Sequence, residues 1–241
     1  MKRDDEQLDR PFDAKKSLGQ NFLTNPLVPV WMADAADLQR GDMVLEIGPG
    51  TGMLTREFLK RGARVIAVEA DERAVTLLTD MFEHELAAGQ LVLEHVDIRE
   101  VDLSKIGLKQ GSYKLIANIP YHLSGILFRM FLSGNCQPST LVFLTQKEVA
   151  ERISRDPKES LLSLSVKAYG TPRYVKTVSR GNFSPKPKVD SAIISVSDIS
   201  KTHFNTLDEA FFFEMLHLGF AAKRKQLLGN LVKKFDRTLL A

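Results

Sequence analysis

The chain has 241 residues, of which 44% are hydrophobic, and its 33 Lys and Arg nearly balance its 30 Asp and Glu. No uninterrupted apolar run reaches the roughly 18–20 residues that span a membrane, and the charged N-terminus lacks the apolar segment of a secretory signal. A lone cysteine, Cys136, excludes an internal disulfide and suits a reducing compartment. We therefore expect a cytoplasmic protein with one α/β domain and a small appendage.

Charge is unevenly distributed along the chain. Residues 171–241 contain twelve Lys and Arg against six Asp and Glu, whereas residues 1–170 contain twenty-one against twenty-four. A basic C-terminal part on a slightly acidic body suggests a polyanionic partner. A merely well-solvated surface explains the same numbers equally well, so charge alone does not show whether the C-terminal part binds a polyanion.

Residues 1–20 show no strong periodicity and are expected to form an extended arm. A helix is predicted from residue 25 or 26 to about 38, and strands then alternate with amphipathic helices. Strands are predicted at 42–48, 64–70, 90–96, 112–119 and 139–146, and helices at 52–62, 71–89 and 124–133. This alternation is typical of βαβ units in a parallel sheet.

The pattern changes after residue 146. Helices are predicted at 147–154 and 161–170, and strands at 173–179 and 189–197, followed from about residue 206 by two helical pieces that meet near 219–222. The predicted division is an arm (1–24), an α/β domain (25–200) and a short helical C-terminal domain (201–241).

A glycine-rich loop follows the first strand. Gly48, Gly50 and Gly52 let the backbone approach a ligand closely. The loop departs from the dinucleotide fingerprint because Met53 occupies the position of its small third residue, and it lacks the Lys-Ser or Lys-Thr pair of a P-loop. Glu46, a poor neighbour for pyrophosphate, suits a cationic ligand.

Two more carboxylates come at the ends of the next strands. Glu69 can accept hydrogen bonds from both hydroxyls of a ribose, and Asp97 from an adenine amine. Because the carboxyl ends of parallel strands share one edge, these residues should converge on one crevice. A ligand with an adenosine end and a positive, phosphate-free end is S-adenosylmethionine. Alternatively, Gly52 only packs a helix and Asp97 only caps a turn.

The tetrapeptide Asn118-Ile119-Pro120-Tyr121 closes the fourth strand. The Asn118 side-chain oxygen and the Ile119 carbonyl can accept the N–H hydrogens of an adenine amine, which points its lone pair at a methyl donor. Pro120 holds the turn extended. The Tyr121 ring offers a surface for a base taken out of its stack. A simple turn with a core tyrosine is the alternative.

Phe183 lies in the proline-rich loop 181–188 and is the expected opposing face for the same base. The alternative is a hydrophobic plug. Lys186 and Lys188 in this loop could meet phosphates, as could Lys223, Arg224 and Lys225, which open the last predicted helix. No metal is expected at the site.

Taken together, these motifs resemble the ribosomal RNA adenine dimethyltransferases of the KsgA type. The resemblance rests on KKSLGQNFL (15–23), VLEIGPGTGMLT (44–55), VIAVEAD (65–71), HVDI (95–98), ANIPY (117–121), QKEVAER (146–152), FSPKPKVDSA (183–192) and FAAKRKQLLGNL (220–231).

This resemblance implies a Rossmann-like, seven-stranded methyltransferase sheet with one antiparallel strand and a small all-α C-terminal domain. It implies cofactor contacts from Asn21 and Leu23, and from Gly48, Glu69, Asp97 and Asn118. The implied reaction is dimethylation of two adjacent adenosines near the 3′ end of small-subunit (16S) rRNA, in a partly assembled 30S subunit. We expect a monomer that does not bind membranes.

The chain departs from the family pattern in two places. It stops seven residues after GNLVKK, where relatives continue through further helices, and it reads NIPY where this branch more often has NLPY. The first departure bears on RNA docking and the second on the target pocket.

Three rival functions remain open. The large-subunit (23S) rRNA methyltransferases of the macrolide-resistance type share most of the motifs. A DNA or small-molecule methyltransferase is less favoured, because a DNA enzyme would have Asp at position 118 and Pro at position 119. The third is a non-catalytic RNA-binding assembly or transcription factor on the same fold.

Overall fold

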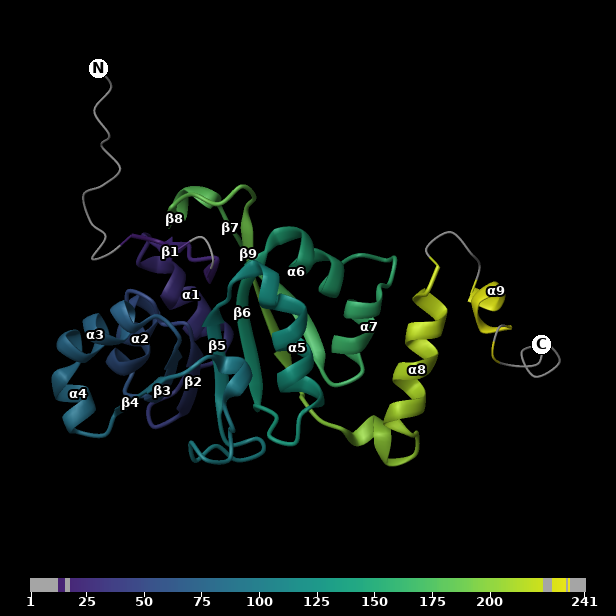
Figure 1. Ribbon diagram of the computed structural model, residues 1–241, viewed down its shortest axis with the longest axis horizontal. Helices are drawn as coiled ribbons and strands as arrows, with labels where there is room; N and C mark the ends of the chain where they lie inside the picture. Colours follow the sequence, from purple (N-terminus) through teal and green to yellow (C-terminus); the bar gives the residue numbers. More distant parts are fainter. Residues whose placement is uncertain (1–12, 16–17, 223–226, 233, 235–241) are drawn as a thin grey trace, which may run out of the picture.

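The computed structural model describes residues 13–15, 18–222, 227–232 and 234. A seven-stranded sheet in the order β4–β3–β2–β5–β6–β9–β7 forms the centre of the molecule, with helices around it (Figure 1). Its strands are β2 (Met43–Ile47), β3 (Arg64–Glu69), β4 (Leu91–His95), β5 (Lys114–Asn118), β6 (Thr140–Gln146), β7 (Thr171–Val178) and β9 (Ser191–Ser197). The alternation of strands and helices in the sequence correctly predicted this α/β architecture.

The central strands are apolar on both faces of the sheet, and helices cover both. These helices are α1 (Leu27–Ala35), α2 (Met53–Lys60), α3 (Glu72–Met81), α4 (Glu83–Ala87), α5 (Ser124–Ser133), α6 (Lys147–Ser154) and α7 (Leu161–Lys167). Two further helices, α8 (Glu209–Phe220) and α9 (Leu227–Leu231), lie beyond α7 (Figure 1). In β5, Leu115 and Ala117 belong to the core that includes Phe128 of α5, whereas Ile116 faces the core that includes Phe58 of α2. Successive side chains of a strand point to opposite faces of the sheet, so helices pack on both faces and the molecule has three layers.

One strand of the sheet runs against the others. β9 pairs antiparallel with β6 on one side and with β7 on the other, while β2, β3, β4, β5 and β6 pair in parallel. The expected seven-stranded sheet with one antiparallel strand is confirmed. Because β9 enters the sheet from the edge where the parallel strands end, Ser191 at its start lies beside Gln146 at the end of β6.

Two features differ from the sequence-based expectation. The helix expected over 71–89 is divided into α3 and α4 at Phe82, whose φ of −119° and ψ of 33° leave the helical region while its side chain stays buried. A second, two-stranded sheet joins β1 (Phe22–Leu23) of the arm to β8 (Phe183–Ser184). Nothing local in the sequence predicts this pairing, because its two strands lie far apart along the chain.

The C-terminal helices lie at the opposite end of the molecule from α3 and α4 (Figure 1). α8 packs through aromatic contacts, with the ring of Phe213 stacked on Tyr169 at a centroid distance of 5.7 Å. The Tyr169 hydroxyl donates to Glu209 at 2.5 Å. In α9, Leu231 is buried and Leu228 is 39% exposed. None of the described helices combines the length and apolar character needed to cross a membrane.

Gly52 begins α2 with a φ of +76° and has no room for a side chain. A Cβ built there would lie 2.8 Å from the Phe82 ring and 2.9 Å from Leu78. Gly89 also has a positive φ, of +67°, but no atom lies within 4 Å of its Cβ position. Gly52 therefore combines a left-handed backbone with tight packing, whereas Gly89 has a left-handed backbone but open space around it.

We expect Gly52→Ala to lower the free energy of unfolding by about 1–3 kcal/mol more than Gly89→Ala does, because only the first substitution forces side chains apart. Both variants carry the left-handed strain of about 1–2 kcal/mol. Urea unfolding of the two variants beside the wild type measures the difference. Equal decreases would mean that Leu78 and Phe82 move aside without cost.

Candidate active site

A cavity opens at the carboxyl ends of β2, β3, β4 and β5, and the arm forms one of its walls. The parallel register of these strands places the residues that follow them at one edge of the sheet. Of the residues singled out in the sequence, those that line the cavity are Asn21, Leu23, Gly48, Gly50, Glu69, Asp97, Asn118, Ile119, Pro120 and Tyr121. The motifs that follow four strands thus converge on one space.

The glycine loop is held to the end of β3 by Glu69. The Gly50 N–H donates to Glu69 Oε2 at 3.1 Å, and the N–H groups of Ala70 and Asp71 donate to Oε1 at 2.9 Å. Burial raises the pKa of Glu69, and these three amides oppose the shift. At Gly48, no atom lies within 4 Å of the Cβ position, so a ligand can reach the backbone there.

Asp97 follows β4 and caps the turn there, which was the alternative interpretation of its position. Its carboxylate caps the short 3₁₀ helix η2 (Ile98–Glu100) by accepting from the Arg99 N–H at 2.9 Å. The Arg99 guanidinium adds bonds of 2.9 and 2.6 Å, and it is the main cause of the lowered pKa of Asp97. Both residues also line the cavity.

The tetrapeptide after β5 is fixed from several sides. Asn118 Nδ2 donates to the backbone carbonyl of Asn21 at 3.1 Å, which joins the arm to the sheet. The Ile119 N–H donates to the Leu144 carbonyl at 3.2 Å. Pro120 has a φ of −57° and a ψ of 129°, the extended conformation that was expected. With Asn118 Nδ2 and the Ile119 N–H already bonded, the Asn118 Oδ1 and the Ile119 carbonyl are the atoms suited to accept hydrogens from a substrate.

The Tyr121 hydroxyl shares a hydrogen bond of 2.6 Å with Ser191 Oγ at the start of β9. Burial raises the pKa of Tyr121, so its hydroxyl stays neutral and acts as a tether for the ring. Ser124, at the start of α5, donates to the Tyr121 carbonyl at 2.9 Å. The residue is therefore held from two elements, while one side of it remains on the cavity.

Glu46 does not line the cavity, contrary to the expectation. Its side chain is fully buried behind the glycine loop, where Thr55 Oγ1 donates to Oε2 at 2.7 Å. Its Oε1 has no hydrogen-bond partner among the described residues. Burial raises the pKa of Glu46 to about 8, so the group is mostly protonated at neutral pH. Glu46 is therefore not placed to present a carboxylate to a cationic ligand.

Three other predictions also concern residues that lie off the cavity. Gly52 packs on Leu78 of α3 and on Phe82. Phe183 is only 4% exposed and pairs with Leu23 between β8 and β1, within the same apolar core as Val28. Lys186 and Lys188 are exposed in the loop that leads into β9. The remaining predicted phosphate contacts, Lys223, Arg224 and Lys225, lie outside the described residues.

Sequence reasoning missed three polar residues at this site. Asp71 accepts bonds from the arm, Arg99 pairs with Asp97 at the cavity wall, and Ser191 tethers Tyr121. Asp71 has the sequence signature of an ordinary helix N-cap, which it is, and that signature hides its other contacts. Ser191 gives no signal, because its partner belongs to another element.

Residues 11–240 match the family described as ribosomal RNA adenine dimethylase. The chain belongs to this family. It is 40% identical over 221 residues to the ribosomal RNA small subunit methyltransferase A of Dehalococcoides mccartyi, a match that covers 91% of this chain and 75% of that relative.

Solved structures with similar folds agree with this assignment. A dimethyladenosine transferase from Plasmodium falciparum superposes with a TM-score of 0.73 at 30% identity, covering 87% of this chain and 74% of that one. The 23S rRNA methyltransferase ErmE superposes with a TM-score of 0.72 at 25% identity, covering 90% of this chain and 86% of that one.

The raised pKa of Glu46 predicts a pH-dependent stability. The folded protein keeps a proton that the unfolded chain, with the ordinary value of 4.5, releases. The contribution of Glu46 to the free energy of unfolding should therefore fall as the pH rises from about 4.5 to about 8. Glu46→Gln should remove this decline, so the variant should gain on the wild type toward pH 8 in urea unfolding. Exposed Glu83→Gln is the control for removing one carboxylate, and parallel curves for wild type and Glu46→Gln would contradict the prediction.

Proposed function

We propose that this member of the family dimethylates the N6 atoms of two adjacent adenosines near the 3′ end of small-subunit rRNA, with S-adenosylmethionine as the methyl donor. The observation that carries the proposal is the position of Asn118-Ile119-Pro120-Tyr121 on the wall of a cavity that also contains the glycine loop, Glu69 and Asp97. Adenine-binding and donor-binding groups then lie within one space.

The cavity fits the donor chemically. Gly48 leaves its backbone open to a ligand, the Glu69 carboxylate can accept from ribose hydroxyls, and Asp97 can accept from an adenine amine. Asn21 and Leu23 of the arm would complete the site from the other side, next to Gly50. When bound, S-adenosylmethionine supplies an electrophilic methyl group.

Methylation of the adenine N6 amine depends more on hydrogen-bond acceptors for its N–H hydrogens than on a general base. Its lone pair is delocalised into the ring, so acceptors that hold its N–H hydrogens expose the lone pair and orient it. The Asn118 Oδ1 and the Ile119 carbonyl would serve in this way, while Tyr121 supports the base by stacking. The N6 proton released in the reaction can pass to water.

Phe183 would contribute the second face of the base-binding site. In the described structure its ring is buried against Leu23, so stacking on a base requires the β1–β8 pair to yield part of that contact. Pairing of this short ribbon involves only Phe22–Leu23 and Phe183–Ser184, which is a small contact to rearrange. Base stacking by Phe183 therefore depends on this rearrangement of β1 and β8.

The proposed substrate is the rRNA of a partly assembled 30S subunit, on which the protein would act as a monomer in the cytoplasm. The relatives from Dehalococcoides mccartyi and Clostridium perfringens are ribosomal RNA small subunit methyltransferases A, which favours this substrate over the large-subunit rRNA of the ErmE type. The division into an arm (1–24), a catalytic domain (25–200) and a helical RNA-docking domain (201–241) belongs to the same proposal.

The test is to incubate the protein with labelled S-adenosylmethionine and either unmethylated small or large subunits, and then to map the modified nucleosides. Label in N6,N6-dimethyladenosine near the 3′ end of small-subunit rRNA is the expected result. Label confined to large subunits would assign the protein to the rival methyltransferase type. RNA binding without label would leave a non-catalytic assembly factor.

Asn118→Ala should abolish methyl transfer while retaining RNA affinity, because its bonds to the amine matter most in the transition state. Tyr121→Phe should be mild, since it removes only the hydrogen bond to Ser191, worth about 0.5–1.5 kcal/mol. Tyr121→Ala should remove roughly 1–3 kcal/mol of base stacking. Single-turnover rates at saturating cofactor separate these cases. A Tyr121→Phe variant as inactive as Asn118→Ala would show that the hydroxyl takes part directly.

Lys186 and Lys188 should bind phosphates, since their loop leads directly into Ser191, which holds Tyr121. Replacing both with Ala should weaken subunit binding and make the slope of log K against log salt shallower by roughly 0.7–0.9 for each phosphate that is no longer neutralised. The control pair is Lys105 and Lys109. Both are exposed and lie in the loop before β5, at the amino ends of the parallel strands, opposite the end with the cavity. An unchanged salt slope in the first variant would place docking elsewhere, with Lys223, Arg224 and Lys225 as the next group to neutralise.

A further inference from the structure

The arm forms a wall of the cavity without belonging to the central sheet. Every residue from Leu18 to Leu23 lines the cavity. The arm is fastened at its far end by the β1–β8 pair and in its middle by the bond from Asn118 to the Asn21 carbonyl. A third attachment lies at its beginning, and it depends on Asp71.

Asp71 gathers donors from the arm onto one buried carboxylate. Lys15 Nζ donates to Oδ1 at 3.2 Å and Gln20 Nε2 donates to Oδ2 at 2.9 Å. Arg73 approaches from α3 with Nε at 3.0 Å and Nη2 at 2.7 Å. The Asp71 side chain is fully buried, and its pKa stays well below the usual range mainly because of Arg73.

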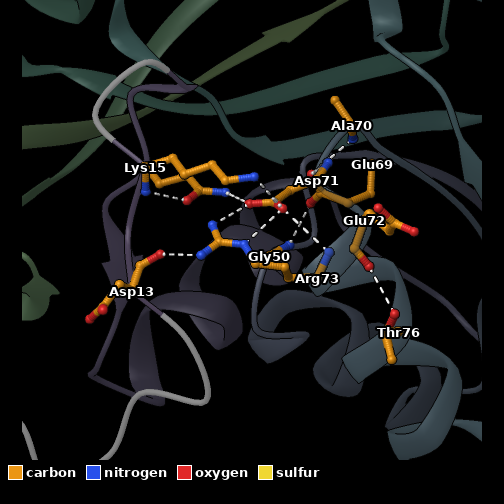
Figure 2. A network of polar contacts seen from close by, with 10 residues as sticks. Asp13, Lys15, Gly50, Glu69, Ala70, Asp71, Glu72, Arg73 and Thr76 are labelled. Carbon is orange, nitrogen blue, oxygen red and sulfur yellow. Dashed lines mark hydrogen bonds and ion pairs between the residues drawn. The ribbon is translucent and has the colours of Figure 1, made fainter.

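Further bonds tighten the same attachment, as Figure 2 shows. Arg73 also reaches the arm itself, donating from Nη1 to the Asp13 carbonyl at 3.0 Å. The Lys15 N–H donates to Gln20 Oε1 at 2.8 Å, which closes the arm into a loop around the carboxylate. A helix N-cap needs none of these bonds. The bond from Arg73 joins the arm to the body, and the bond between Lys15 and Gln20 links the two arm residues that donate to Asp71.

Asp71 is also connected directly to the carboxylate proposed to hold the ribose. Its own N–H donates to Glu69 Oε1 at 2.9 Å, and Glu69 Oε2 accepts from Gly50. The same residue therefore orients Glu69 through its backbone and holds the arm through its side chain. Removal of the side-chain charge would leave Lys15 and Arg73 close together without the carboxylate that joins them.

We propose that Asp71 is a positioning residue that holds the arm closed over the donor site and so sets how long S-adenosylmethionine stays bound. This inference rests on the proposed function, because it assumes that the cavity binds this donor. Asp71 itself need not contact the donor. Its effect is transmitted through Lys15 and Gln20 to the wall formed by Leu18–Leu23.

The test compares Asp71→Asn with Asp42→Asn in the full chain. Asp42 pairs with Lys114 at 2.7 Å and accepts from the Gln39 N–H at 2.8 Å, and it does not line the cavity. Asp71→Asn should raise the dissociation rate of S-adenosylmethionine roughly ten- to hundredfold, the equivalent of one or two charged hydrogen bonds. Asp42→Asn should leave that rate unchanged.

Two further measurements distinguish positioning from general stability. The KM for the donor should rise in Asp71→Asn while kcat at saturating donor changes little, and trypsin should cleave the arm faster. If Asp71→Asn fails to fold, the double variant Lys15→Ala and Gln20→Ala removes the arm's donors while leaving the paired Asp71 and Arg73 in place, and it should raise the same dissociation rate.

The outcomes separate the two proposals. A wild-type protein that binds no S-adenosylmethionine would overturn the proposed function. A wild type that binds it, together with Asp71 and arm variants whose dissociation rates are unaltered, would overturn the role of Asp71 alone. Equal acceleration in Asp42→Asn would also overturn it, because the effect would then be one of overall stability.

Discussion

The buried carboxylate of Glu69 accepts hydrogen bonds from the backbone of Gly50, Ala70 and Asp71, and the geometry of the cavity depends on this junction. It fixes the glycine loop after β2 to the end of β3. Through Asp71 it reaches the arm, and through the arm it reaches Asn118 on β5. The groups proposed to bind the donor and the substrate come from distant parts of the chain, and these hydrogen bonds link them to one another.

Two buried glutamates at this end of the sheet, Glu46 and Glu69, both have a pKa raised by burial, but they differ in their hydrogen-bond donors. Glu46 has one hydroxyl donor on one oxygen and, among the described residues, no partner for the second, and its burial raises its pKa to about 8. Glu69 has three backbone donors, which oppose the effect of burial. Desolvation disfavours a carboxylate unless hydrogen bonds replace the water that burial removes. Of the two, Glu69 is therefore the one suited to bind a ligand, and it alone lies on the cavity.

The family assignment and the cavity are two independent observations that agree. Membership follows from the match over residues 11–240. The proposed chemistry follows from acceptors at the end of β5 facing a space that Glu69 and Asp97 also line. The arm lines the same cavity with Leu18–Leu23 and is attached to the body through Asp71.

The sequence by itself determined the order of strands and helices, the glycine loop, and the convergence of Glu69, Asp97 and Asn118 on one edge. Local periodicity identifies the strands and helices. Because strands joined by helices run parallel, the residues that follow them lie at the same end of the sheet. Only the tertiary structure decided that Glu46 and Gly52 do not line the cavity, that Phe183 is buried against Leu23, and that Asp71 binds the arm. Those outcomes depend on which distant groups cover a residue and remove its water, and residues as far apart in the chain as Gln20 and Asp71 leave no local pattern that reveals their contact.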